Sequence, residues 1–200
     1  MDKFWNTRRN ALGALTICAG GLAMPHFALA ADPPGAEPKS IADLKAKFPV
    51  LARCEGVWKG VFRRFDGNAK LLAEFKSTIT KRYLPDAPWP RVYHQTNHYD
   101  FADGKTQTLE TFGHYADGKI HFESDRVKGW QLDDPADPHK RSIFLHMVYK
   151  SDPDQYVYEL INVSDDGKFR TRMTQFLKAG RTVQRTMIDE EKVSGDWSKS

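Results

Sequence analysis

The chain has 200 residues, of which 40% are hydrophobic, 12% aromatic and 28% charged, with a formal charge of +4. This composition excludes a disordered chain, and after the first 30 residues no apolar run is long enough to cross a bilayer. Basic and acidic residues are interleaved, whereas a nucleic-acid partner would call for a basic stripe. We therefore expect a globular protein of one domain, with no nucleic-acid partner and no integral membrane segment.

Residues 1–30 contain the parts of an export signal in the right order. The segment Thr7–Leu12, with sequence TRRNAL, resembles the twin-arginine translocation motif, and a mild apolar stretch follows it. Ala28-Leu29-Ala30 then forms a small-x-small cleavage pattern. The sequence therefore predicts a twin-arginine signal peptide over 1–30 and a mature protein in the bacterial periplasm. Removing this signal leaves Cys54 as the only cysteine, which cannot form an internal disulfide or build a zinc site alone.

The next segments predict a linker and one short helix. Residues 31–40, with sequence ADPPGAEPKS, are rich in proline and indicate a flexible linker. Helical spacing over 41–51 places the apolar residues on one face, with Ser40 as N-cap. We assign 41–193 to a single barrel domain and 194–200 to a tail.

From Glu55 onward the pattern is typical of β-strands. Aromatic and β-branched residues alternate with polar ones, and Asp-Gly pairs recur at 66–67, 103–104, 117–118 and 166–167, with Ala179-Gly180 as a fifth turn. We predict nine strands, over 55–65, 72–83, 91–101, 105–115, 119–128, 142–150, 155–163, 168–178 and 181–191. The fold class is therefore all-β, an up-and-down antiparallel β-barrel whose closure removes exposed edges.

Gly56-Val57-Trp58 on the first strand resembles the Gly-x-Trp signature of the lipocalin and calycin superfamily. The resemblance implies that a basic side chain from the last strand packs across Trp58, and Arg185 fits that role, with Arg181 second. The segments 126–130, 156–159 and 185–190 also resemble a bacterial lipocalin-like family of unknown function. Residues 56–60, with sequence GVWKG, match the opening of nitrobindin-like haem barrels. That family takes its iron ligand from a late histidine, and this sequence has none after His146, so we expect no cofactor.

Turn register predicts which side chains face each other across the C-terminal hairpins. Two-residue turns at 166–167 and 179–180 pair Ile161 with Arg172, Glu159 with Thr174, and Thr174 with Arg185. A four-residue turn at 151–154 pairs His146 with Glu159. One apolar face would then carry four ionisable side chains, namely His146, Glu159, Arg172 and Arg185.

The N-terminal hairpins give a second set of predicted contacts. A two-residue turn at 117–118 pairs Tyr115 with Ile120 and His114 with His121. A two-residue turn at 103–104 would place His94 and His98 on the interior face as pocket lining. These two lie roughly 13 Å apart along the strand and cannot share a metal ion, so we expect no metal site.

Three functions are compatible with these patterns. The first is a periplasmic barrel that binds a small, partly apolar ligand with an acidic group. Arg172 and Arg185 would meet the acid, and the apolar part would contact Trp58, Tyr115, Phe122, Phe144 and Phe176. The second is a cofactor-free isomerase, hydratase or lyase with His146 as general base and Glu159 as its orienting carboxylate. The third is a haem or metal carrier. A purely structural charge network inside the barrel remains open beside them.

Overall fold

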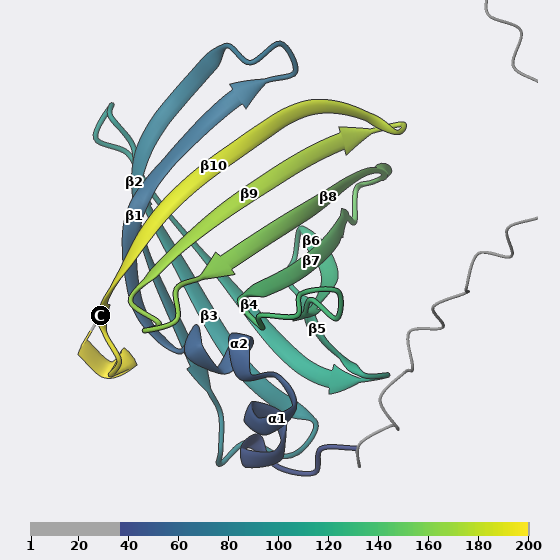
Figure 1. Ribbon diagram of the computed structural model, residues 1–200. Helices are drawn as coiled ribbons and strands as arrows, with labels where there is room; N and C mark the ends of the chain where they lie inside the picture. Colours follow the sequence, from purple (N-terminus) through teal and green to yellow (C-terminus); the bar gives the residue numbers. More distant parts are fainter. Residues whose placement is uncertain (1–36, 200) are drawn as a thin grey trace, which may run out of the picture. The chain divides into compact units, whose positions relative to one another are not determined.

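The structure, a computed structural model, describes residues 37–199, so the predicted signal peptide and most of the predicted linker lie outside it. Ten antiparallel strands form one closed barrel in the order β1-β10-β9-β8-β7-β6-β5-β4-β3-β2 (Figure 1). The strands are β1 (Gly56–Asp66), β2 (Leu71–Tyr83), β3 (Arg91–Asp100), β4 (Thr106–Ala116), β5 (Lys119–Glu123), β6 (Val127–Asp133), β7 (Ser142–Tyr149), β8 (Asp152–Val163), β9 (Phe169–Lys178) and β10 (Arg181–Ser194). The prediction of an all-β, up-and-down antiparallel barrel is confirmed.

The strand count exceeds the prediction by one because the expected strand 119–128 is two strands. The Ser124 N–H donates to the Val127 carbonyl oxygen at 2.9 Å and closes a tight turn there. The Ser124 hydroxyl accepts further hydrogen bonds from the N–H groups of Arg126 and Val127 at 3.3 Å. A short polar side chain that bonds to nearby backbone competes with the sheet ladder. The strand direction therefore reverses after Glu123, and β5 remains short.

The predicted helix over 41–51 is two helices, α1 (Ile41–Lys47) and α2 (Pro49–Arg53). A separate 3-10 turn, η1 (Trp197–Lys199), follows β10 near the C-terminus of the chain. The predicted N-cap is confirmed, since the Ser40 hydroxyl accepts a hydrogen bond from the Asp43 N–H. The break falls at Phe48 because a residue before proline avoids the helical conformation. Within 37–199, no helix has both the length and the apolar character needed to cross a membrane.

The two helices cover one end of the barrel, the lower end in Figure 1. The carboxylate of Asp133 at the end of β6 accepts hydrogen bonds from the backbone N–H groups of Val50 and Leu51, at 2.7 and 2.9 Å. These bonds satisfy donors that the first turn of α2 leaves free. Burial raises the pKa of Asp133 to about 6, although both N–H groups oppose the rise.

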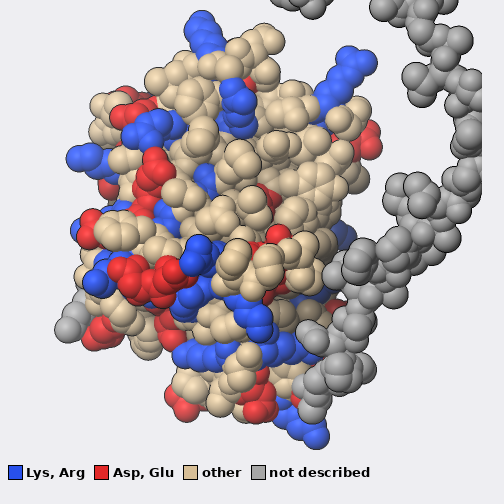
Figure 2. Space-filling view, in the orientation of Figure 1, with Lys and Arg blue, Asp and Glu red and all other residues tan. Residues whose placement is uncertain are grey.

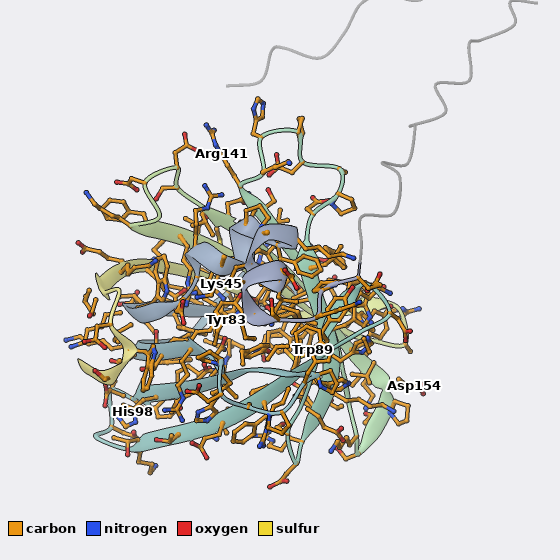
Figure 3. All side chains as sticks on the ribbon, turned by 90° about the horizontal axis from the view of Figure 1, so that it is seen from below. Lys45, Tyr83, Trp89, His98, Arg141 and Asp154 are labelled. Carbon is orange, nitrogen blue, oxygen red and sulfur yellow. The ribbon has the colours of Figure 1, made fainter. Side chains whose placement is uncertain are left out.

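This helix-covered end is filled with side chains. Leu44, Val50 and Leu51 from the helices pack with Trp58, Ile79 and Ile143 from the strands, and all are fully buried. Figure 3 views the molecule from this end, with Lys45 of α1 near Tyr83 at the end of β2. The ammonium group of Lys45 lies 4.9 Å from the centre of the Tyr83 ring. The open space of the barrel is therefore confined to its other end.

The predicted registers are correct at the two-residue turn 117–118 and across β8 and β9. Tyr115 faces Ile120 and His114 faces His121, as predicted. Glu159 faces Thr174 and Ile161 faces Arg172, as predicted. Asp117 and Gly118 both have positive φ, 50° and 72°, which is the geometry that a tight hairpin of this twist requires.

Three other predicted registers are wrong by one residue. Across β7 and β8, Glu159 faces Leu145 rather than His146, and the register shifts between Val148 and Tyr149. Across β9 and β10, Thr174 faces Thr186 rather than Arg185, with a shift between Thr182 and Gln184. Across β3 and β4 the turn runs from Phe101 to Lys105, longer than assumed. Each slip moves a strand's side chains to the opposite face.

Candidate ligand-binding cavity

A cavity of about 880 Å³ occupies the half of the barrel away from the helices. Inward-facing aromatic residues from neighbouring strands form much of its wall: Phe62, Phe75, Tyr99, Phe101, Phe122 and Phe176. Phe62 and Phe75 stack at 5.2 Å between ring centres, and Tyr99 meets both edge-on. The volume lies within the range of 300–1,000 Å³ that small-molecule sites usually have.

The cavity also opens through the side of the barrel. Because β5 ends at Glu123, the first half of β4, from Thr106 to Thr111, pairs only with β3. The lining includes Thr108 and Glu110 from the outer side of β4 together with the turn Ser124–Arg126. The cavity lining therefore continues along the unpaired side of β4.

The floor of the cavity is charged. The Arg172 guanidinium on β9 donates from Nε to Oε1 of Glu159 at 2.8 Å, and Thr174 donates its hydroxyl to the other carboxylate oxygen at 2.8 Å. A second carboxylate, that of Glu190 on β10, lies 3.7 Å from Nη1 of Arg172. Burial alone would lower the pKa of Arg172, but both carboxylates outweigh it and raise that pKa above its ordinary value. Arg172 therefore remains protonated, with two anions already beside it.

A second ion pair lies beneath this floor. Arg170 donates from Nε to Glu190 at 2.5 Å, and its guanidinium lies 4.3 Å from the centre of the Trp58 ring. Burial disfavours the Glu190 carboxylate, but Arg170 and Arg172 outweigh it and hold its pKa below the ordinary value. Gly60 on β1 leaves room for this pair, since a Cβ there would lie 2.6 Å from Cγ of Glu190. A Cβ at this position would lie closer still to the backbone carbonyl oxygen of Asp189, so the close approach of β10 accounts for the second glycine of the sequence GVWKG.

A third buried cation, Lys81 on β2, has no carboxylate partner among the described residues. Its ammonium donates to Oε1 of Gln131 at 3.4 Å and lies 4.7 Å from the centre of the Tyr93 ring. Gln131 in turn donates to the Tyr93 hydroxyl at 2.8 Å, and both of these residues line the cavity. Burial lowers the pKa of Lys81 to about 8.

The basic residue that packs across Trp58 is therefore not the predicted one. Arg170 and Lys192 lie over the ring, at 4.3 and 4.9 Å from its centre. Arg185, with Arg181 as second choice, was expected there, but Arg185 is exposed outside the barrel, 5.7 Å from the Phe65 ring. The register shift between Thr182 and Gln184 accounts for the error, since it turns odd-numbered residues of β10 outward.

Among the other predicted site residues, six lie inside the barrel and four lie outside it. Phe122, Phe176, Glu159 and Arg172 line the cavity, and Trp58 is buried at the filled end. Tyr115 is also buried, but it lies near the helices rather than at the cavity. Its ring packs against Phe48, and its hydroxyl accepts a hydrogen bond from Lys47 at 3.0 Å. Four predicted residues lie outside the barrel: His94, His98, Phe144 and His146.

The predicted acid/base pair of His146 and Glu159 is wrong. His146 belongs to an aromatic cluster on the outer surface, with ring centres 5.7 Å from Trp130 and 5.2 Å from Tyr158. Burial among these rings lowers its pKa. Figure 2 shows wide uncharged areas on the side formed by β8, β9 and β10, where Tyr158 and Met173 are among the exposed residues. The imidazole and the Glu159 carboxylate lie on opposite faces of the sheet, since Glu159 lines the cavity and His146 packs among the outer rings.

The predicted pocket histidines are also outside. His94 stacks on Phe112 at 4.4 Å and contacts Arg82, and burial lowers its pKa. His98 hydrogen-bonds to Thr108 at 2.9 Å and lies at the periphery in Figure 3. In the described part of the chain, no three His, Cys, Asp or Glu side chains are grouped to hold a metal ion.

Sequence reasoning missed Arg170, Glu190, Lys81 and Gln131. The alternation in β10 contained the signal for Glu190, because Thr186, Ile188 and Glu190 are all buried on one face. The register assumed from a two-residue turn placed that face outside. The buried Lys81 had no comparable signal, since a lysine between polar neighbours in a strand is usually exposed.

Comparison with known proteins identifies one matching family profile and several solved structures with a similar fold. Residues 45–195 match the family profile described as Domain of unknown function (DUF3598), N-terminal. A protein of unknown function of the DUF3598 family from Nostoc punctiforme superposes with a TM-score of 0.53 and 14% identity, over 72% of this chain and 49% of that one. The chain thus spans about half the length of the Nostoc protein.

The S-type phycobiliprotein lyase CPES from Guillardia theta superposes with a TM-score of 0.56 and 16% identity, over 78% of this chain and 93% of that one. No curated protein matches this chain. At these identities the two structures support the fold of the barrel, and they leave its ligand to be argued from the cavity.

Proposed function

This chain belongs to the DUF3598 family, whose profile covers residues 45–195, and we propose that its barrel binds a small, partly apolar ligand with an acidic group. The cavity of about 880 Å³ carries this proposal. Aromatic rings would contact the apolar part of the ligand, and polar side chains at the floor would orient it. Sites with a few convergent polar groups in an apolar wall are typical of small-molecule binding.

In this proposal the aromatic wall supplies apolar contact area, and the charged floor supplies a hydrogen-bond donor. Phe62, Phe122 and Met147 offer apolar area, and burying such area contributes about 25 cal/mol per Å². Arg172, held by Glu159, presents a fixed donor to a ligand oxygen that reaches the floor. The floor pair is preorganised, so binding would not have to order it.

The two alternative functions lose their support in this geometry. An acid/base enzyme with His146 would need that imidazole at the cavity, and it lies on the outer surface. A haem carrier of the kind that the sequence GVWKG resembles would need a histidine ligand. Among the described residues that line the cavity, none is histidine or cysteine.

Filling the cavity should abolish binding. Met147 on β7 lines the cavity, whereas Met173 on β9 is 47% exposed on the outer face. We expect Met147→Trp to weaken binding of the fluorescent anion 8-anilinonaphthalene-1-sulfonate at least tenfold, because the indole would occupy its place. A fluorescence titration measures this, with circular dichroism to check the fold.

Met173→Trp is the matched control, since it adds the same indole outside the barrel. It should leave the affinity within twofold of the unaltered protein. Equal weakening by both variants, or by neither, would mean that the probe does not bind in the cavity and would contradict the proposed function.

We also propose that the protein is exported to the bacterial periplasm by the twin-arginine route. The segment TRRNAL at residues 7–12 and the pattern Ala28-Leu29-Ala30 support this location. Changing Arg8 and Arg9 together to lysine should retain the precursor in the cytoplasm, as an immunoblot of cell fractions would show. If the doubly substituted protein still reached the periplasm and were processed, the twin-arginine route would be wrong.

A further inference from the structure

Two cations at the mouth of the cavity form no ion pair with any residue of the described range 37–199. Arg64 on β1 lines the cavity near its open end, with its guanidinium 5.4 Å from the centre of the Phe75 ring. Its Nε is buried and has no hydrogen-bond partner among the described residues. Arg126, in the turn between β5 and β6, lines the same mouth, and no ion pair holds it within 37–199.

The neighbouring residue Arg63 shows how the same side chain behaves when it faces outward. Its guanidinium pairs with Glu74 at 3.0 Å and with Asp189 at 2.9 Å. Arg64, one position along, faces the cavity and meets an aromatic ring instead of a carboxylate. Since a partly buried cation is stabilised by an anion, Arg64 is positioned for an anion, and no residue within 37–199 forms an ion pair with it.

The two mouth arginines converge on one further polar side chain. Burial raises the pKa of Tyr149, whose side chain lines the mouth, and the nearby charges of Arg126 and Arg64 oppose that rise. Three carboxylates also line this region. Glu123 is paired with Lys150 at 2.6 Å and Glu110 lies 3.2 Å from His94, while Asp125 has no ion pair among residues 37–199. Among the described residues, the mouth therefore has two cations without an ion pair, Arg64 and Arg126, against one such carboxylate, and this excess favours an added negative charge.

The floor is less suited to an acid. Arg172 already has Glu159 at 2.8 Å and Glu190 at 3.7 Å, so a third carboxylate would be repelled by two anions as well as attracted by one cation. The apolar wall, including Phe62, Phe122 and Met147, lies between floor and mouth. An amphiphile would therefore enter with its apolar body first.

We propose that Arg64, assisted by Arg126, binds the carboxylate of an elongated amphiphilic acid at the mouth of the cavity, with the apolar body directed toward the floor. This inference rests on the proposed function and adds the ligand class, a monocarboxylate with a long apolar or aromatic body, and its orientation. Arg172 would donate to a neutral oxygen at the far end of the ligand rather than to its acidic group.

The test compares an acid with its uncharged ester. Binding of 11-(dansylamino)undecanoic acid and of its methyl ester is measured by fluorescence titration with the unaltered protein and with Arg64→Gln, Arg126→Gln and Arg63→Gln. The unaltered protein should bind the acid about tenfold more tightly than the ester. Arg64→Gln should remove most of this preference by weakening binding of the acid, with the ester changed less than twofold.

Arg63→Gln is the matched control, and it should leave both affinities within twofold. Arg126→Gln alters an exposed turn residue and should reduce the preference for the acid even if Arg64→Gln does not fold. Equal affinities for acid and ester in the unaltered protein, or a preference that survives both cavity-facing substitutions, would overturn the inference while leaving cavity binding intact. Failure of both probes to bind would instead contradict the proposed function itself.

Discussion

Replacing Glu190 by glutamine is expected to lower the free energy of unfolding by about 3–5 kcal/mol, the range seen when one member of a buried ion pair is removed. The Glu190 side chain is fully buried, pairs with Arg170 at 2.5 Å and lies 3.7 Å from Arg172. Glutamine keeps the shape of the side chain but removes its charge. The guanidinium of Arg170 would then have no carboxylate partner among the described residues, and that of Arg172 would keep only Glu159. Urea unfolding monitored by tryptophan fluorescence measures the loss.

Glu191 provides a matched control for this prediction. It follows Glu190 on β10 but is exposed on the outer face, so Glu191→Gln should change the free energy of unfolding by less than about 0.5 kcal/mol. If Glu190→Gln were no more destabilising than Glu191→Gln, the charge network under the cavity would not stabilise the fold as described.

Replacing Lys81 by methionine is expected to stabilise the protein at pH 7 by about 2 kcal/mol. Burial lowers the pKa of Lys81 from 10.5 to about 8, and a shift of this size makes the buried charge cost about 3 kcal/mol below pH 8. Methionine has a similar volume and no charge. Part of the gain is offset because Lys81 donates to Gln131 and lies over the Tyr93 ring.

The pH dependence distinguishes this mechanism from a general packing effect. Between pH 8 and 10.5 the unfolded chain keeps a proton on Lys81 that the folded protein has released, so the stability of the unaltered protein rises with pH through this window. The difference in free energy of unfolding between Lys81→Met and the unaltered protein should therefore decrease as the pH rises from 8 to 10.5. The exposed Lys76 of the same strand is the control, since Lys76→Met should show no such change. A Lys81→Met protein that is less stable at pH 7 would contradict the account.

The alternation of apolar and polar residues was sufficient to predict the barrel because side-chain direction has period 2 in every strand. At the hairpin around residues 117–118, the turn residues were also sufficient to predict the strand register. Asp117 and Gly118 both adopt positive φ, the turn takes two residues, and the facing pairs around it follow directly. The Glu159 and Thr174 pair was likewise predictable.

The site was less predictable because its composition depends on single-residue irregularities. The shifts between Val148 and Tyr149, and between Thr182 and Gln184, carry no residue type that marks a bulge in the sequence. Each bulge exchanges the two faces of a strand. Because of the first shift, His146 faces outward instead of into the barrel. Because of the second, Thr186 and Glu190 face the interior and Arg185 faces outward. Lys81 is buried because the barrel closes around it, and the residues next to it in the sequence carry no pattern that would predict this burial.

Native mass spectrometry of the protein purified from its own cells tests most directly whether the barrel carries a ligand. The account predicts a one-to-one complex that releases an acidic, partly apolar small molecule on denaturation, and no such complex for Met147→Trp prepared in the same way. A mass equal to the bare chain in both preparations, together with no binding of the added dansylated acid, would contradict ligand binding. The same molecule retained by Met147→Trp at full occupancy would place it outside the cavity.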